Sequence, residues 1–401
     1  MLGNEDTWTR TWTNFRERSM DIAIDSNDDV YILGYTTQED EYYDIVLLKY
    51  NKTGHLIREQ ILGEEPYMDW WKLAIDTSNN VYIGGPRWYS DTEFLAKLNP
   101  EGNVLWNLTL SCELNSISTD SLNNIYLTSY IDNDNVIIKL NSSGSQLWNF
   151  TWEPLKHIEY ADFKIDHDDN LIIAGSSGTY PFTSYIAKFN SSGNKLWNIT
   201  QSNMNTEYFP QKLAIDHENS LICVSYKELF KINSSGHLIW SHGYSGYDFY
   251  VYMDVDSEGN IYLVKNLLSG VPNDDHFFFD GITSIETCLT IFLTKFDVNG
   301  DFIWQKRCTG CVTASVSGIA LDIDNNIYIS GTLSADSIHY QRHDILLMKN
   351  PRNFQGLCIP IYYDIIFVLS NIVGFFIIYP SYKYFKKRKQ NKDKGLFDDK
   401  N

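Results

Sequence analysis

One short unit recurs seven times along the chain, and this repetition limits the fold more than any other feature of the sequence. The unit consists of apolar residues ending in Asp, a polar turn, an apolar-Tyr-apolar run, a variable segment, Lys-apolar-Asn or Asp, a turn with Gly, and apolar-Trp. Its clearest copy runs from Leu73 to Trp106. Successive copies start about 40 to 66 residues apart, which is typical of the four-stranded blades of β-propellers.

Three residue types mark equivalent positions in the copies. The Asp recurs as Asp25, Asp76, Asp120, Asp166, Asp216, Asp256 and Asp322. The Lys recurs as Lys49, Lys97, Lys139, Lys188, Lys231, Lys295 and Lys349. The Trp recurs as Trp106, Trp148, Trp197, Trp240 and Trp304, and Arg58 takes its place in the first copy.

Each copy predicts four short strands. In the second copy we expect them at Lys72–Asp76, Val81–Gly85, Leu95–Asn99 and Val104–Thr109. Asp and Asn suit the first turn because they bond to their own backbone and tolerate positive φ. Apolar residues on both faces of the inner strands indicate sheets that are stacked face to face.

The two ends of the repeat region predict how the ring closes. The seventh copy stops at Asn350 without its final Trp strand, and Thr7–Trp12 is an unaccompanied strand of that kind. We expect it to lie beside Met348, because closing the ring removes exposed sheet edges. The predicted fold is all-β, a seven-bladed β-propeller over residues 5–350 that the N-terminal strand closes.

Two parts of the unit resemble known repeat families. The run from Lys139 to Trp148 resembles the tryptophan-docking motif of PQQ-like β-propeller repeats, and Ala74–Asp76 with Val81–Gly84 resembles SBBP-type repeats, often found in surface proteins of prokaryotes. Enzymes of the PQQ family have eight blades and a calcium-bound cofactor under adjacent cysteines, whereas Cys308 and Cys311 are two residues apart. The resemblance therefore implies the non-enzymatic branch, with no cofactor.

The C-terminal part predicts a single transmembrane helix. Residues 359–380 are apolar and long enough to cross the hydrocarbon core, and residues 351–358 form a short stalk before them. Residues 381–401 contain eight Lys or Arg and three Asp, which is typical of a cytoplasmic tail. Asn371, near the middle of the span, favours self-association through a hydrogen bond to a second span.

The start of the chain leaves two topologies open. Residues 1–10 show neither the apolar core nor the cleavage site of a signal peptide. Either an export signal lies upstream and the propeller is outside the cell, or the protein is tail-anchored with its propeller in the cytoplasm. The basic tail favours the first arrangement, a single-pass protein of the cell membrane.

Three of the six cysteines lie close together in the sequence. We expect a disulfide between Cys288 and either Cys308 or Cys311 if the propeller is extracellular. A redox pair and half a zinc site are the alternatives, but the second paired motif of a zinc site is absent. Cys112 and Cys223 lie in apolar runs and are expected to pack in the core.

Aromatic clusters in the variable segments are the candidate binding surface. The longest segment is the insertion 265–291 of the sixth copy, and long loops on a rigid scaffold commonly carry binding residues. Packing over the blade edge is the alternative. The candidate residues are Trp70, Trp71, Tyr180, Phe182, Phe277, Phe278 and Phe279.

Seven Asn-x-Ser/Thr sequons fit, but do not require, an extracellular propeller. They begin at Asn51, Asn107, Asn141, Asn149, Asn190, Asn198 and Asn233. The Asp-rich turns resemble calcium loops without the Gly and Glu of an EF-hand, so turn chemistry explains them and calcium is only an alternative. No serine-hydrolase elbow, zinc-protease motif or P-loop is present.

The net charge of −19 argues against a nucleic-acid partner, because an acidic surface repels phosphates. The sequence favours a membrane-anchored, non-catalytic binding or adhesion platform for a protein or glycan. One alternative is an extracytoplasmic carbohydrate-active hydrolase or lyase with carboxylates around the central channel. The other alternative is a cytoplasmic tail-anchored scaffold.

Overall fold

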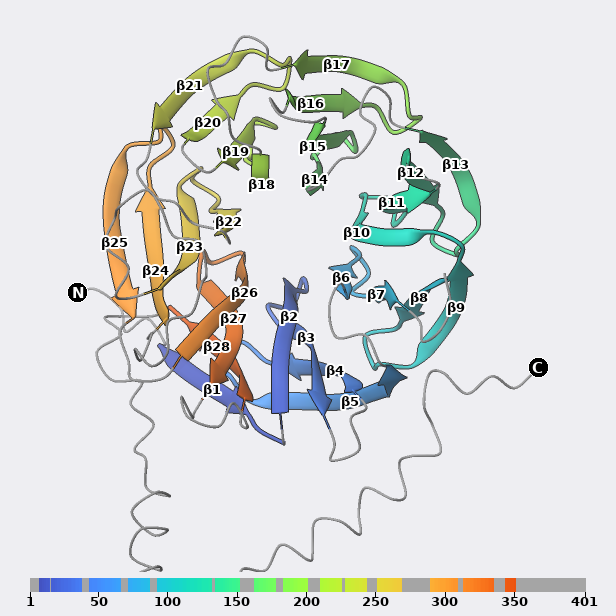
Figure 1. Cartoon of the computed structure of the whole chain (residues 1–401), viewed down its shortest axis with the longest axis vertical. Helices are drawn as coiled ribbons and strands as arrows, with labels where there is room; N and C mark the ends of the chain where they lie inside the picture. Colours follow the sequence, from blue (N-terminus) through green and yellow to red (C-terminus); the bar gives the residue numbers. More distant parts are fainter. Residues whose placement is uncertain are drawn as a thin grey trace, which may run out of the picture.

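Seven four-stranded antiparallel sheets surround a central channel in the computed structural model (Figure 1). This confirms the predicted seven-bladed β-propeller. The described residues are 7–14, 16–37, 43–65, 71–86, 92–131, 134–151, 162–177, 183–200, 210–225, 228–243, 251–268, 289–308, 313–334 and 343–350. None of them belongs to a helix that could cross a membrane, and the predicted span at 359–380 lies outside them.

In each blade the first strand lies nearest the channel and the fourth lies at the rim (Figure 1). Blade 1 comprises β2 (Arg16–Ile24), β3 (Val30–Thr37), β4 (Tyr43–Tyr50) and β5 (Leu56–Glu65). Blade 2 comprises β6 (Lys72–Ile75), β7 (Val81–Pro86), β8 (Glu93–Leu98) and β9 (Val104–Leu110). Blade 3 comprises β10 (Glu113–Thr119), β11 (Ile125–Ile131), β12 (Asp134–Leu140) and β13 (Gln146–Thr151). Blades 4 and 5 comprise β14 (Asp162–Ile165), β15 (Leu171–Ser177), β16 (Thr183–Phe189) and β17 (Lys195–Thr200); β18 (Pro210–Ile215), β19 (Leu221–Ser225), β20 (Glu228–Ile232) and β21 (Leu238–Gly243). Blades 6 and 7 comprise β22 (Val251–Val255), β23 (Ile261–Leu268), β24 (Leu289–Phe296) and β25 (Phe302–Cys308); β26 (Thr313–Leu321), β27 (Ile327–Ser334), β28 (His343–Lys349) and β1 (Trp8–Trp12).

The N-terminal strand closes the ring as the sequence predicts. β1 pairs antiparallel with β28, with Thr9 opposite Met348. β1 also contacts blade 1: the Arg10 Nε donates a hydrogen bond of 2.7 Å to the Gly54 carbonyl, and the Trp8 ring lies against the same glycine. Gly54 has φ +80°, and a Cβ there would lie 2.8 Å from that ring, so both backbone and space require glycine. β1 therefore joins the last blade to the first.

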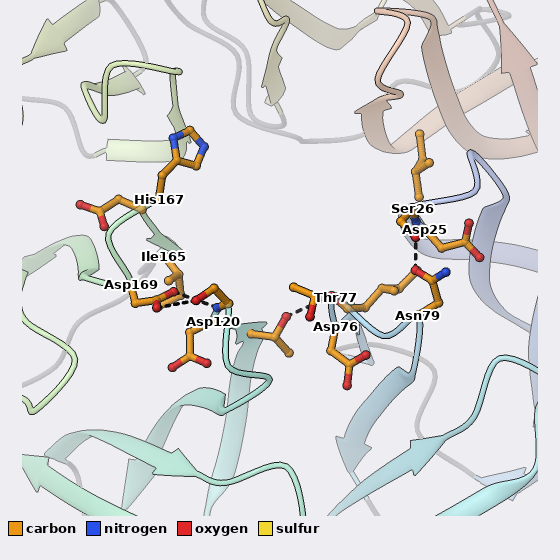
Figure 2. A pocket seen from close by; sticks show the side chains of 14 residues that line it. Asp25, Ser26, Asp76, Thr77, Asn79, Asp120, Ile165, His167 and Asp169 are labelled. Atoms are coloured by element: carbon orange, nitrogen blue, oxygen red, sulfur yellow. Dashed lines mark hydrogen bonds between the residues drawn. The ribbon is translucent and has the colours of Figure 1, made fainter.

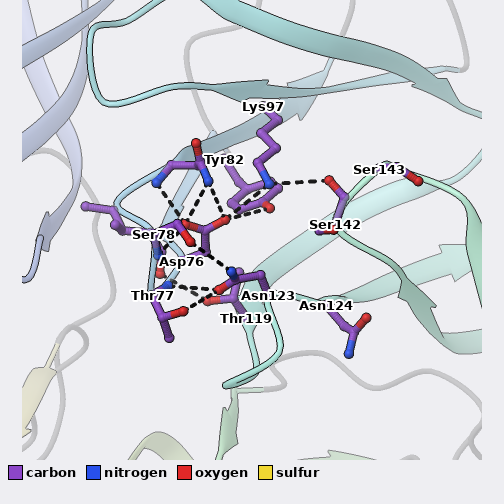
Figure 3. A network of polar contacts seen from close by, with 12 residues as sticks. Asp76, Thr77, Ser78, Tyr82, Lys97, Thr119, Asn123, Asn124, Ser142 and Ser143 are labelled. Carbon is purple, nitrogen blue, oxygen red and sulfur yellow. Dashed lines mark hydrogen bonds and ion pairs between the residues drawn. The ribbon is translucent and has the colours of Figure 1, made fainter.

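A buried ion pair between the repeated Asp and Lys lies inside the blades. The Nζ–Oδ2 distances include 3.2 Å for Lys97–Asp76 and 3.0 Å for Lys139–Asp120. Asp76 also accepts hydrogen bonds from the backbone N–H groups of its own turn and from the Tyr82 hydroxyl at 3.0 Å (Figure 3). A buried carboxylate is stable only when its oxygens are bonded in this way.

The repeated Trp bonds to the next blade in blades 2 to 5, and the repeated Lys does so in blades 2 to 4 and in blade 7. Lys97 Nζ and Trp106 Nε1 both donate to the Ser142 carbonyl in the following blade, at 3.3 and 3.2 Å. Trp148 bonds in the same way to the Ser191 carbonyl at 3.2 Å. Equivalent bonds join Trp197 to Ser234 and Trp240 to Val298. Where blade 1 lacks the Trp, Arg58 donates to the Pro100 carbonyl at 2.9 Å.

The meander gives the ring two different ends. The turns after the first and third strands all lie at one end, which we call the turn face; the other strand ends lie at the loop face. Six turns at the turn face contain an Asn or Asp with φ near +60°, and Gly259 takes this position in blade 6. Several of these side chains accept a backbone N–H from the preceding blade, as Asn79 does from Ser26 at 3.0 Å (Figure 2). The turn face is therefore a hydrogen-bonded belt.

Replacing Trp8 with Ala should lower the free energy of unfolding by about 2 kcal/mol, less than the ~3 to 5 kcal/mol of a fully buried Trp because this ring is half-buried. Urea unfolding followed by circular dichroism measures the loss. Thr11→Ala, an exposed change on the same strand, should cost under about 0.5 kcal/mol. Equal effects of the two variants would contradict a closing role for the Trp8 ring.

Replacing Lys97 with Met should destabilise the protein by about 3 kcal/mol, because Asp76 would remain buried without its cation. Adding Asp76→Asn should recover part of the loss. Burial raises the pKa of Asp76, but hydrogen bonds from Asn80 and Lys97 outweigh it and lower the pKa. The contribution of the pair is therefore present above pH 3.8 and is lost as the pH falls through the lower pKa of the folded state.

The control for this ion pair is Lys52, which is exposed and lies 3.9 Å from Asp28. Lys52→Met should change stability by less than about 0.5 kcal/mol, since solvent screens such a pair. Unfolding curves for both Lys→Met variants at pH 7 and pH 3 make the comparison. If the two variants lose the same stability, burial does not determine the strength of the pair.

Candidate functional site

The predicted binding segments join strand ends at the loop face. Most of their candidate residues lie outside the described part of the chain: Trp70, Tyr180, Phe182, Phe277, Phe278, Phe279, Cys288 and Cys311. Cys308 ends β25, and its side chain is also outside that part. The disulfide between Cys288 and either Cys308 or Cys311 therefore remains a prediction from the sequence. Cys112 and Cys223 are buried free thiols, as expected for core cysteines.

Trp71 is the one aromatic candidate whose side chain is described, and it is 1% exposed. It packs in the hydrophobic cluster between blades 1 and 2, with its ring 6.3 Å from that of Phe94. It also lines a cavity at the loop face. Its position therefore fits a cavity wall better than an exposed contact patch.

The sequons divide into two groups. Asn107, Asn149 and Asn198 are exposed on the outermost strands β9, β13 and β17. The other four are half-buried in turns, where their Oδ1 atoms accept backbone N–H groups; they are Asn51, Asn141, Asn190 and Asn233. The side chains of the strand group are thus open to solvent, whereas those of the turn group bind the backbone N–H groups of their own turns.

The cavity at the loop face has a volume of about 230 Å³ and lies where the inner strands of blades 1, 2, 6 and 7 begin; we call it the mouth cavity. Its charged lining consists of Arg18 and Lys72. Its other lining residues are Ser19, Met20, Tyr35, Trp71, Tyr252, Ser315, Val316, Ser317 and Thr332. The exposed lining of this cavity is mainly polar. A concave site in which several polar groups converge is a candidate small-ligand site.

β-Bulges shape this end of the inner strands. The register shifts between Ser19 and Asp21 in blade 1 and between Val316 and Gly318 in blade 7. The extra residues, Met20 and Ser317, both line the mouth cavity. Bulges commonly redirect side chains next to binding sites.

The two cations of the mouth cavity make no hydrogen bond or ion pair with any other described residue. Enclosure in the channel lowers the pKa of Lys72, which the nearby Asp21 carboxylate partly offsets. Both Asp21 oxygens accept backbone N–H groups, from Ile22 and from Leu73 of the next blade, at 2.9 and 3.0 Å. That carboxylate is therefore held by backbone rather than by Lys72.

Two further carboxylates in the inner strands bridge neighbouring blades. Asp162 accepts the Leu213 N–H at 2.8 Å, and Asp254 accepts the Leu321 N–H at 2.8 Å. Burial raises the pKa of both Asp21 and Asp254. Asp21 and Asp162 occupy one repeat position, which holds Lys72 and Lys212 in blades 2 and 5, whereas Asp254 lies two residues further along its strand. The sequence does not show the partners of these acids on other blades.

A second hollow, about 420 Å³, lies at the turn face among the first turns of blades 1 to 4 (Figure 2). Its acids are engaged: Asp25 and Asp76 bind lysines, and Asp169 accepts the Ser121 N–H at 2.8 Å. Within the described residues, no three His, Cys, Asp or Glu side chains are grouped to hold a metal. The mouth cavity, with free donors, is therefore the better candidate site.

The described part of the chain forms a seven-bladed β-propeller, and solved structures share this fold. Virginiamycin B lyase from Staphylococcus aureus matches with a TM-score of 0.54 and 12% identity over 85% of this chain and 98% of that one. A catalytically inactive variant of it with quinupristin matches with 0.55 and 11%, over 85% and 99%. The propeller domain of the Trilobed protease from Pyrococcus furiosus, described as an open velcro topology, matches with 0.51 and 9%, over 85% and 100%.

These identities show the fold alone. No protein-family model matches this chain. No curated protein matches it either. The likeness to SBBP and PQQ-like repeats therefore stays a prediction from the sequence motif.

Glu93→Gln should stabilise the protein at neutral pH. Burial is the main cause that raises the pKa of Glu93 to about 7, and the negative charge of nearby Glu113 adds to it. The hydrogen bond from the Leu114 N–H lowers this pKa and offsets only part of the rise. Protonated Glu93 therefore stabilises the folded state. This stabilisation is fully present below pH 4.5 and is lost as the pH rises through about 7, which lowers the free energy of unfolding by about 3 kcal/mol. At pH 8, Glu93→Gln should therefore be more stable than the unsubstituted protein by most of this free energy, and at pH 4 the two proteins should be equally stable.

Thermal unfolding from pH 4 to 8 tests this prediction, and Glu101→Gln is the control because Glu101 is exposed in a turn. The control should leave the pH profile of the midpoint unchanged. A Glu93→Gln profile that runs parallel to that of the unsubstituted protein would show that Glu93 does not titrate in this range.

Proposed function

We propose that the protein is a membrane-anchored, extracytoplasmic binding platform of the SBBP and PQQ-like repeat kind, which binds a protein or glycan partner at the loop face without catalysis. The observation that carries the proposal is the mouth cavity, where Arg18 and Lys72 make no hydrogen bond or ion pair with another residue in the described part of the chain. Lys72 is half-buried and Arg18 is exposed. A half-buried cation without a partner is costly, so an anionic ligand that pairs with Lys72 and Arg18 gains binding energy.

The contrast between the two faces supports this choice of binding surface. The turn face repeats one short turn seven times and bonds it to its neighbours. The strand ends at the loop face are joined by segments that differ in length and sequence from blade to blade. Variation on a uniform scaffold is typical of binding loops.

The membrane anchor and the outside location follow from sequence features. The apolar run at 359–380 and the basic tail after it support a single-pass protein with the tail in the cytoplasm. The three exposed strand sequons are compatible with a propeller outside the cell. Asn371 in the span supports self-association. The alternative is a tail-anchored scaffold with the propeller in the cytoplasm.

A second candidate function is an extracytoplasmic lyase or hydrolase. The raised pKa values of Asp21 and Asp254 favour it, since acids with such shifts cluster at catalytic sites. Virginiamycin B lyase also shares the fold. Both carboxylates, however, are fixed by backbone N–H groups of the next blade, and this explains them as structural acceptors. Binding without catalysis is therefore the stronger proposal.

Protease treatment of intact cells that express the full chain with a tag on the C-terminal tail tests the location. The expected result is removal of the propeller while the tail tag stays protected. Detergent lysis before treatment is the control and should expose both. If the propeller survives until the cells are lysed, the extracytoplasmic platform is wrong, and partners should be sought in cytoplasmic complexes at the membrane.

A further inference from the structure

The charge of the mouth cavity is opposite to that of the protein. The chain carries a net charge of −19, yet the cavity lining contains Arg18 and Lys72 and no Asp or Glu. Further cations lie nearby: Lys212 faces Tyr252 of the lining at 5.9 Å, and Arg18 and Arg16 help to lower the pKa of His343, after burial. The cavity is therefore a positive site in an acidic molecule.

The nearby carboxylates form no direct ion pair with the two lining cations in the described residues, although the charge of Asp21 acts on Lys72 from a distance. Asp21 gives both oxygens to backbone N–H groups and forms no ion pair with Lys72 in the described residues. Lys72 thus keeps all three ammonium donors, and Arg18 keeps its guanidinium donors. Such donors bind an oxyanion strongly, because bonds between charged groups are about twice as strong as neutral ones.

The rest of the lining suits a ring with hydroxyl groups. The exposed lining is mainly polar, and Ser315 and Thr332 carry hydroxyls. Among the aromatic lining residues, Tyr35 and Trp71 are 3% and 1% exposed, and Tyr252 is half-buried. The volume of about 230 Å³ greatly exceeds the ~30 Å³ of one water and is below the ~300 Å³ at which drug-sized sites begin. A bare inorganic anion would leave much of it empty, whereas one sugar-sized group suits it.

We propose that the mouth cavity binds an acidic sugar residue, with its carboxylate or sulfate between Arg18 and Lys72 and its ring beside Tyr252 and the hydroxyls of Ser315 and Thr332. This inference rests on the proposed binding function and specifies its ligand as an acidic glycan. The loop face would then engage the end of the glycan chain, since the cavity holds one residue.

Ligand-observed NMR on the full chain in detergent tests the proposal, with glucuronate, glucose and sulfate as probes. Glucuronate should bind and glucose should not. Lys72→Gln and Arg18→Gln should each weaken glucuronate binding at least tenfold. Lys164→Gln is the matched control and should leave it unchanged, because Lys164 is also half-buried on an inner strand but does not line the cavity.

A second measurement does not depend on the variants folding. Raising the KCl concentration should weaken glucuronate binding to the unsubstituted chain, because salt screens the two cations. Equal binding of glucose and glucuronate, no binding of glucuronate, or an equal loss in Lys164→Gln would overturn the proposal. Sulfate that binds as well as glucuronate and displaces it would also overturn it, since the site would then be one for free anions.

These outcomes separate this inference from the proposed function. Failure of glucuronate binding in a protein whose propeller is removed from intact cells by protease leaves the platform in place and excludes only the acidic-sugar site. A propeller that protease cannot reach from outside excludes the platform itself, whatever the result with glucuronate.

Discussion

The buried pair of the repeated Asp and Lys is the interaction on which the rest of the ring depends. Taking two charges out of water is costly, and the cost is met only when every oxygen and ammonium proton finds a partner. Each Asp therefore also binds its own turn, and Lys97, Lys139 and Lys188 reach a carbonyl of the next blade. One polar network thus sets the turn, holds the blade and fixes the spacing to its neighbour.

The apolar part of the unit completes that connection. The Trp ring on the outermost strand lies against the turn of the following blade, and its indole N–H shares the carbonyl that Lys binds, as Trp106 does at Ser142. In the last blade this ring belongs to Trp8, far away in the sequence. Closure of the propeller therefore repeats the packing of this Trp ring against the turn at Gly54. The Trp8 indole N–H makes no hydrogen bond to a described residue. The bonds across this junction run from Arg10 to the Gly54 carbonyl and from Lys349 to the Lys52 carbonyl.

This repeated network is satisfied within the protein, so function is expected where the repeat is broken. On the inner strands the position of Asp21 is occupied elsewhere by Lys72, Asp162, Lys212 and Tyr252. The carboxylates among these residues bond to neighbouring backbone, whereas Lys72 does not. Within the described residues, the ammonium donors of Lys72 have no partner because of this departure, and β-bulges lie at the neighbouring strand ends of blades 1 and 7.

The sequence alone determined the number of blades, the four strands of the second blade to within two residues, and the place of the N-terminal strand beside Met348. It could do so because each unit repeats its turn and core chemistry, and because the missing strand has one partner. Which aromatic residues are accessible could not be inferred: Trp71 reads as a surface residue in a variable segment, yet two blades enclose it. Only the tertiary structure decided that Arg18, Lys72 and Tyr252 line one cavity. The ring brings the inner strands of blades 1, 2 and 6 close together, and no pattern in the sequence indicates that these three residues are neighbours.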